Sequence, residues 1–155
     1  MTDLTPNFNR LQRDFGDYAA FHVTLGNKLC HYLGIPLITL SMLGLLSHIQ
    51  ILQTQGLPIW FSLNGGTLLW VLSFLFYLRL DWRVALPFSV TSLGMYVIGT
   101  VLSLATLWVL FIIGWTVQFL GHSVYEKKRP AFYSNLRHLL IGPLWIFDRL
   151  IRGRT

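Results

Sequence analysis

Long runs of apolar residues separated by short polar segments dominate the chain from Leu33 onward. A helix that crosses a bilayer needs about 20 mostly apolar residues. The first run covers about 33–52, contains no charged residue and ends at a polar break over 53–56. The second run covers about 59–78 and is rich in Trp, Phe and Leu. The pattern predicts one membrane-spanning helix in each run.

The stretch from Val84 to Gly121 follows a charged cluster at 79–83 and contains no formal charge. It is too long for one crossing and long enough for two. We therefore expect two further spans, at about 84–101 and 104–121, with a turn near Gly99-Thr100.

The remaining segment, 122–155, is strongly basic. Within it, residues 139–150 are apolar, but the stretch is short and contains Gly142-Pro143. These features are typical of a helix that lies at the membrane surface. The sequence thus predicts an all-α integral membrane protein, with four transmembrane helices and a short interfacial C-terminal helix in a single domain over 1–155.

Composition and charge agree with this fold class. Hydrophobic residues make up 54% of the chain and charged residues 12%, against about 25% charged residues in soluble domains. Lys and Arg number three before the first span, two in the middle loop and seven in the tail, and the other two loops have none. The positive-inside rule then predicts that both termini are cytoplasmic, in a bacterial inner membrane or the endoplasmic reticulum. Because the net charge of +6 is explained by orientation, we expect no nucleic-acid partner.

The predicted topology brings several polar side chains to the same membrane surface. We expect four histidines there, with two carboxylates: His22, His31, His122, His138, Asp81 and Glu126. His48 lies alone at the opposite end of the first span and is expected to have no functional role. A polar cluster near bilayer depth is costly unless it is paired, liganded or functional.

Imidazole is a common ligand of Fe, Zn, Cu and Ni. His122 and Glu126 are spaced i,i+4 and share a helix face, as do Asn27 and His31. His22 and His31 are nine residues apart and would point to opposite sides of a regular helix. A metal site that uses both therefore requires a bend in the chain, for which Gly26 is a candidate.

Each of these residues also has a structural interpretation. Histidines at span ends often bond to carbonyl groups or lipid headgroups, and Glu126 has basic neighbours with which it could form a solvated charge cluster. Asp81 suits a helix cap or a loop ion pair. The pattern Gly99-x-x-x-Ser103 fits a close helix contact. The chain has no Ser-His-Asp elbow, no phosphate-binding glycine loop and no His-Glu-x-x-His motif.

Two segments resemble one known family. The first reads His-x4-Asn-x3-His-x2-Gly-x-Pro over 22–36, and the second reads Gly-Trp-Thr-Val-Gln-Phe-Leu-Gly-His-Ser-Val-Tyr-Glu-Lys over 114–127, followed by Arg-Pro-Ala over 129–131. Both are similar to the small membrane family that includes the fungal 2-hydroxy fatty acid dioxygenase of phytosphingosine breakdown. Leu80-Asp81 and Gly142-Pro143 match its remaining landmarks, so the likeness covers nearly the whole chain.

The resemblance implies an Fe²⁺-dependent enzyme that uses O2 to shorten a 2-hydroxy fatty acid by one carbon, with loss of the carboxyl carbon. It implies that His22, His31 and His122 are catalytic and hold the iron, with His138 or Glu126 as further candidates. Asn27 and Gln118 would fix the orientation of the imidazole rings without binding the metal themselves. The substrate carboxylate would be attracted by Lys127, Lys128 and Arg129.

Two other functions fit the same residues. One is a non-catalytic membrane protein, an assembly or lipid-organising factor with a structural metal or none. The other is a haem protein with two axial histidines. Membrane lipid is a partner in every case, and the oligomeric state is left open.

Overall fold

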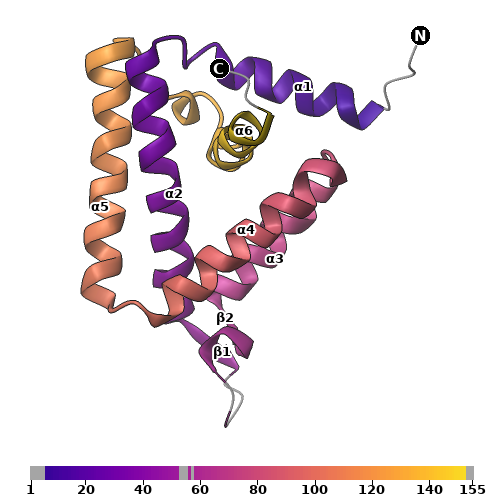
Figure 1. Cartoon of the computed structure of the whole chain (residues 1–155), viewed down its shortest axis with the longest axis vertical. Coiled ribbons are helices and arrows are strands. Elements are labelled where there is room, and N and C mark those ends of the chain that lie inside the picture. Colours follow the sequence, from indigo (N-terminus) through magenta and orange to yellow (C-terminus); the bar gives the residue numbers. More distant parts are fainter. Residues whose placement is uncertain (1–5, 53–55, 57, 153–155) are drawn as a thin grey trace.

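The computed structural model describes residues 6–52, 56 and 58–152. The described part is mostly helical, with one two-stranded antiparallel ribbon, and Figure 1 shows the arrangement. The elements are α1 (Pro6–Ala19), α2 (Leu25–Ser47), β1 (Gln50–Leu52), η1 (Ile59–Phe61), β2 (Leu63–Asn64), α3 (Gly65–Leu78), α4 (Trp82–Val101), α5 (Leu104–Leu120), η2 (Gly121–Glu126), η3 (Ala131–Tyr133) and α6 (His138–Arg152).

The long helices form two antiparallel pairs that diverge from one end (Figure 1). α2 packs along α5 in the first pair, α3 along α4 in the second, and α2 also contacts both helices of the second pair. At the opposite end, α1 and α6 lie across the space between the pairs (Figure 1). The fold is therefore wide at the end that carries α1 and α6 and narrow at the end that carries the β-ribbon.

Glycines bring α2 into close contact with its neighbours. A Cβ atom on Gly34 would lie 2.8 Å from the Gly114 carbonyl oxygen on α5, and one on Gly99 would lie 2.8 Å from the Gly44 Cα atom. Small residues allow helix backbones to approach where the surrounding solvent is apolar. The close helix contact predicted at Gly99 is confirmed, whereas Ser103 instead caps α5 by accepting a hydrogen bond from the Thr106 N–H at 3.1 Å.

The first apolar helix begins and ends earlier than the predicted 33–52. It begins at Leu25 because the Thr24 hydroxyl caps it, accepting from the Asn27 N–H at 3.4 Å. Hydrophobicity alone did not predict its first turns, because they contain polar residues such as Asn27 and His31. In the structure these residues are buried rather than solvated. Residues 50–52 belong to the β-ribbon instead of the helix.

The second apolar helix is shorter than the predicted 59–78. Asn64 caps it by accepting from the Thr67 N–H at 2.9 Å, so α3 contains only 14 residues and is preceded by η1 and β2. Within the described residues, three helices are long and apolar enough to cross a membrane: Leu25–Ser47, Trp82–Val101 and Leu104–Glu126. The fourth crossing stays a prediction.

The uncharged stretch divides as predicted into two helices, α4 and α5. The turn lies at Leu102-Ser103 and not at Gly99-Thr100. Gly99 is still part of α4 and packs against α2, and Ser103 caps the start of α5. Asp81 caps α4, accepting from the Arg83 N–H at 2.9 Å, which confirms the structural interpretation of this residue.

The C-terminal apolar stretch forms α6, which continues through Pro143 without a break. One face of α6, including Ile141, Leu144 and Trp145, is buried in a core shared with Leu11 and Phe15 of α1. Leu150 and Ile151, in the last turn of α6, are exposed. Its expected position at the membrane surface is not tested by these contacts.

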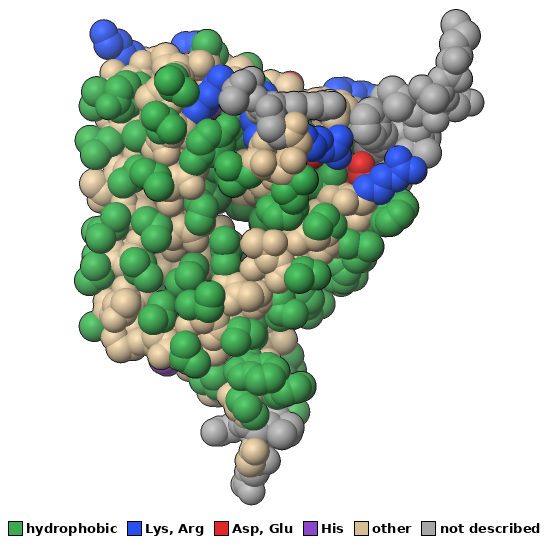
Figure 2. Space-filling model, in the orientation of Figure 1, with side chains coloured by type: hydrophobic (Ala, Val, Ile, Leu, Met, Phe, Trp, Pro, Cys, Tyr) green, Lys and Arg blue, Asp and Glu red, His purple; other side chains and the backbone are tan. Residues whose placement is uncertain are grey.

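Polar and apolar side chains are segregated over the surface. Lys and Arg side chains gather at the end where α1 and α6 lie, and hydrophobic side chains cover the flanks of the helices (Figure 2). Val90, Val101 and Ile112 are 73%, 76% and 59% exposed. An apolar flank of this extent fits lipid as its solvent.

Candidate metal centre

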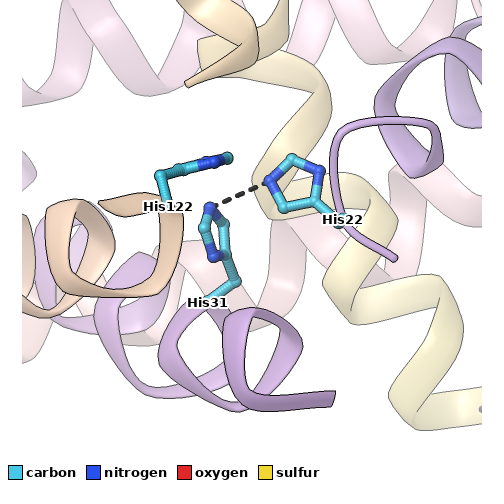
Figure 3. Close-up of side chains that lie close together, drawn as sticks. All are labelled: His22, His31 and His122. Atoms are coloured by element: carbon cyan, nitrogen blue, oxygen red, sulfur yellow. Dashed lines mark hydrogen bonds between the residues drawn. The ribbon is translucent and has the colours of Figure 1, made fainter. Parts of the chain in front are cut away.

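Three histidines from three separate elements meet at the wide end of the fold. His22 lies between α1 and α2, His31 lies in the second turn of α2, and His122 lies in η2 after α5. Each offers one ring nitrogen, and the three nitrogens lie within 4.8 Å of one another. Figure 3 shows the three rings, each from a different segment of the chain, pointing toward one another. We refer to His22, His31 and His122 as the histidine cluster.

The bend that brings His22 to His31 lies before α2. A turn after α1 changes the direction of the chain, so that α2 runs away from the wide end (Figure 1). Its hydrogen bonds run from the His22 N–H to the Ala19 oxygen at 3.0 Å and from the Phe21 N–H to the Tyr18 oxygen at 3.2 Å. The prediction that Gly26 makes the bend is wrong. Gly26 lies inside α2, where a Cβ atom would be 2.2 Å from the Tyr125 ring, so its role is close packing.

His122 is placed by a local widening of the helix. Residues Gly121–Glu126 continue α5 as a π-helix, a feature often found at functional sites. Gly121 lies directly against α2, since a Cβ there would be 2.6 Å from the Asn27 side-chain oxygen and 2.8 Å from the Cys30 Cβ. This contact brings His122 over the N-terminal turns of α2.

The hydrogen bonds of two rings define which nitrogens face the centre. The His22 Nδ1 lies 2.6 Å from the Tyr18 carbonyl oxygen, and the His31 Nδ1 lies 2.9 Å from the Asn27 carbonyl oxygen. A carbonyl oxygen only accepts, so each Nδ1 carries the proton in these contacts. The two Nε2 atoms, 3.0 Å apart, then present lone pairs to each other.

Facing lone pairs are unfavourable unless a cation lies between them. A proton is disfavoured because burial lowers the pKa of His22 to about 4. Two imidazole nitrogens that bind one divalent ion at about 2.1 Å lie about 3.0 Å apart in octahedral and about 3.4 Å apart in tetrahedral coordination, which is close to the observed separation of 3.0 Å. The buried His122 Nδ1 has no hydrogen-bond partner among the described residues. The histidine cluster is therefore compatible with a metal ion.

All three rings are sealed from solvent. His22 and His31 are each 2% exposed and His122 is 3% exposed. The Tyr18 ring stacks on His22, with centroids 4.1 Å apart. Sequence reasoning missed Tyr18; the only signal was its position four residues before His22, which places its carbonyl within reach of the imidazole.

Glu126 lies beside the histidine cluster but not in it. Its carboxylate accepts from the Val23 and Thr24 N–H groups at 3.1 Å each, from the Thr24 hydroxyl at 2.8 Å and from the Asn27 amide at 3.2 Å. Its surroundings are these hydrogen bonds and not a solvated charge cluster, and its candidate role as a further metal ligand stays a prediction. The carboxylate ties the start of α2, and hence the His22 turn, to the helix that carries His122.

Asn27 and Gln118 were both expected to orient the imidazole rings, but only Asn27 contacts one of them through a hydrogen bond. Asn27 acts through its main-chain oxygen on His31, while its side-chain amide donates to the Phe21 oxygen at 3.2 Å and to Glu126. Gln118 is buried close to Gly34 and near His122. Within the described ranges, no hydrogen bond joins Gln118 to an imidazole.

The remaining candidates lie outside the histidine cluster. His138 is buried nearby, with its Nδ1 3.0 Å from the Ala131 oxygen. His48 is exposed at the far end of α2. Lys127, Lys128 and Arg129 are exposed and are not among the described residues that line the adjoining cavity, so the geometry gives their predicted role with the substrate carboxylate no direct support.

The histidine cluster opens into an apolar cavity of about 360 Å³ between the two helix pairs. The space-filling view is open between these pairs, beneath α6 (Figure 2). Its walls are mostly aliphatic and aromatic, and the four buried histidines lie at one end of it. Ligand sites commonly combine an apolar cavity of about this size with a few polar groups that fix orientation.

The fold and the site define the class of protein: an all-α protein with three helices suited to crossing a membrane and a buried histidine cluster at the end of an apolar cavity. The chain belongs to the Mpo1-like family of 2-hydroxy-palmitic acid dioxygenases, whose family profile matches residues 8–154.

One relative is the 2-hydroxy-palmitic acid dioxygenase MPO1 of Saccharomyces cerevisiae. It is 35% identical over 149 residues, which cover 88% of this chain and 76% of the relative. The family resemblance inferred from the two motifs is thus confirmed, and the assignment to 2-hydroxy fatty acid dioxygenases holds at the level of the family. No solved structure matches the chain.

Proposed function

We propose that this protein is an Fe(II)-dependent dioxygenase that shortens 2-hydroxy fatty acids by one carbon at the membrane. The observation that carries the proposal is the position of three buried imidazole nitrogens, within 4.8 Å of one another, at one end of an apolar cavity. Family membership supplies the substrate class and the use of O2.

His22, His31 and His122 would hold the metal. Three protein ligands leave coordination positions open, as in other non-haem iron oxygenases. The chemistry that ferrous iron supplies at such a site is activation of O2 beside a substrate held through its hydroxyl and carboxylate oxygens.

The chain's own groups prepare this site. The carbonyl oxygens of Tyr18 and Asn27 hold His22 and His31 in the Nδ1–H tautomer, so that both Nε2 atoms are free to bind a cation. Hydrogen bonds of this kind also orient the rings. Glu126 fixes the spacing between the His22 turn and the His122 helix through its four hydrogen bonds. The apolar walls exclude water from the reacting end.

In the proposed reaction, the bond between the carboxyl carbon and the hydroxyl-bearing carbon breaks. With the shortened acid as product, one O2 is consumed and one CO2 and one water are released, which balances the atoms. The acyl chain would lie in the apolar cavity, where each buried CH2 contributes about 0.8 kcal/mol. Binding affinity therefore comes from the chain, and the polar end is left for the chemistry.

We also propose that α3, with the residues before it, completes a fourth crossing and that both termini are cytoplasmic. In Figure 2, Lys and Arg side chains lie mainly at the wide end of the fold. The positive-inside rule associates such a concentration of positive charge with the cytoplasmic face. Reporter fusions at the C-terminus and within residues 53–56 test this. Equal cytoplasmic activity of both fusions would contradict it.

The experiment that tests the function uses purified protein reconstituted anaerobically with Fe(II). Supplied with O2 and 2-hydroxypalmitate, it should consume O2 and release a fifteen-carbon product, and omission of iron should abolish both. A folded protein with a full complement of iron that gives no product would favour the non-catalytic alternative. A Soret band on purification would instead indicate haem.

A further inference from the structure

The apolar cavity follows α2 from the histidine cluster toward the narrow end of the fold. The α2 side chains that line it recur every three or four residues, at His31, Ile35, Ile38 and Met42, with Thr39 and Leu43 beside them, and so form one face of the helix. At 1.5 Å per residue, the distance from His31 to Leu43 along the helix axis is about 18 Å. The cavity is therefore long and narrow in relation to its volume of about 360 Å³.

Trp70 lies in the second turn of α3, toward the narrow end of the fold, and lines this cavity. Its indole N–H donates to the Ser92 hydroxyl at 3.1 Å and to the Ser89 carbonyl oxygen at 3.3 Å, which ties the ring across to α4. Both serines, with Trp70, line the cavity. The indole ring is thus held across the space between α3 and α4, and we refer to it as the floor of the cavity.

A buried polar cluster holds the helices in place beneath this floor. The Tyr96 hydroxyl of α4 lies 2.8 Å from the Asn64 amide, which donates to it, and 3.0 Å from the Thr67 hydroxyl. Asn64 is fully buried and Tyr96 is 2% exposed. Because buried, mutually satisfied hydrogen bonds resist displacement, the start of α3 cannot easily move away from α4. The depth of the cavity is fixed by the fold.

The dimensions match a single lipid chain. The hydrocarbon core of a bilayer is about 30 Å thick and is shared by two leaflets, so one long acyl chain reaches about 15 Å. None of the described residues that line the cavity is Asp, Glu, Lys or Arg. A chain whose head lies at the histidine cluster would end near Trp70.

We propose that the cavity measures the acyl chain of the substrate from the histidine cluster to Trp70, and that Trp70 and the adjacent Ser89 set the upper limit of chain length. This inference rests on the proposed function for the identity of the head group. The ligand class is a single unbranched long-chain 2-hydroxy acid bound with its terminal methyl group against the indole.

The first test compares chain-length profiles of turnover. Purified iron-loaded enzyme is assayed with 2-hydroxy acids of ten to twenty-two carbons. Trp70→Ala should move the optimum of kcat/KM to longer chains, with a gain of about fourfold for each methylene that the enlarged cavity buries. Ser89→Phe, which adds a ring inside the cavity, should move the optimum to shorter chains. Trp108→Ala is the matched control, because Trp108 is 50% exposed on α5 and is not a lining residue.

The second test does not require turnover. Palmitic acid brominated at its last two carbons quenches nearby tryptophan fluorescence, and unbrominated 2-hydroxypalmitate should reverse the specific part of that quenching. Trp70→Phe should remove most of the reversible component, whereas Trp108→Phe should leave it in place. Trp70→Phe also provides a conservative variant if Trp70→Ala does not fold.

The outcomes separate the two proposals. If no 2-hydroxy acid is turned over but the reversible quenching depends on Trp70, the proposed function fails and the acyl site stands. If turnover occurs and the profiles of Trp70→Ala and Ser89→Phe match those of wild type, the inference is overturned. Reversible quenching that is unchanged in Trp70→Phe would overturn it as well.

Discussion

The Nε2 atoms of His22 and His31 lie 3.0 Å apart while the Nδ1 atom of each ring faces a main-chain carbonyl oxygen. The residues are far from adjacent on a regular helix, and a turn before α2 brings them together. Because the carbonyl oxygens can only accept, the two rings present lone pairs to the same point. That arrangement is suited to a shared cation, and the predictions below follow from it.

Single His→Ala substitutions within the histidine cluster should abolish stoichiometric iron binding, because each removes one of three ligands. We expect iron content after anaerobic reconstitution to fall at least tenfold in the His22, His31 and His122 variants, as measured by elemental analysis. His48→Ala is the matched control, since His48 is exposed at the far end of α2. Equal iron in all four variants would refute the assignment.

Removal of the metal should lower stability. An ion that binds only the folded protein stabilises it by about 2.7 kcal/mol at a free concentration one hundred times its Kd. We expect a chelator to lower the thermal midpoint of the wild-type protein in detergent. The His31→Ala variant should show almost no further decrease, and a decrease as large as that of wild type would place the stabilising ion elsewhere.

Glu126→Ala should weaken both folding and metal binding. The change leaves the partly buried N–H groups of Val23 and Thr24 without their acceptor. A fully buried unsatisfied donor costs about 1–3 kcal/mol, so we expect a loss near the lower end of that range. Since Glu126 is not one of the grouped ligands, we expect a raised Kd for iron with unchanged stoichiometry, measured by titration. Glu126→Gln, which keeps an acceptor oxygen, should recover part of both losses.

Asp81→Ala provides the control for Glu126. Asp81 also accepts a hydrogen bond from a main-chain N–H, but at the exposed start of α4. Loss of such a cap costs about 1 kcal/mol. Iron affinity should not change, and a change equal to that of Glu126→Ala would show that general destabilisation explains both.

Substitution of Gly99 should disrupt the contact between α2 and α4. A Cβ atom there would lie 2.8 Å from the Gly44 Cα atom, which is main chain and cannot rotate away. We expect Gly99→Leu to lower the thermal midpoint substantially and to reduce the folded yield in detergent. Gly94→Ala on the same helix is the control, because nothing lies within 4 Å of its Cβ position, and it should be neutral or stabilising by up to about 1 kcal/mol.

The pattern of apolar runs was sufficient to predict an all-α chain and the division of residues 84–121 into two helices. Both predictions follow from the requirement that backbone N–H and C=O groups in lipid form hydrogen bonds within their own helix. The boundaries of α2 and α3 were predicted less well. Asn27 and His31 look like loop residues when only hydrophobicity is counted, yet they lie in α2 and are buried. At α3, the cap at Asn64 shortens a helix whose preceding residues are equally apolar.

The motifs also singled out His22, His31 and His122, through their shared side of the predicted membrane and the family resemblance. Their role as ligands remains a proposal, but their proximity in space is observed. Glu126 was predicted only as a charged neighbour or a possible ligand. Its hydrogen bonds run to residues about a hundred positions away, and no local spacing could indicate them.

What the amino-acid sequence determined by itself is therefore the helical character, the segregation of positive charge and the set of histidines, because each depends on residue type and short-range spacing. The turn before α2, the partners of Glu126 and the cavity lined by Trp70 depended on tertiary structure. These features arise where α1, α2, α5 and α6 pack together, or where α3 meets α4. Contacts between elements distant in the chain are decided by the shapes of the packed surfaces, which no periodicity within one segment contains.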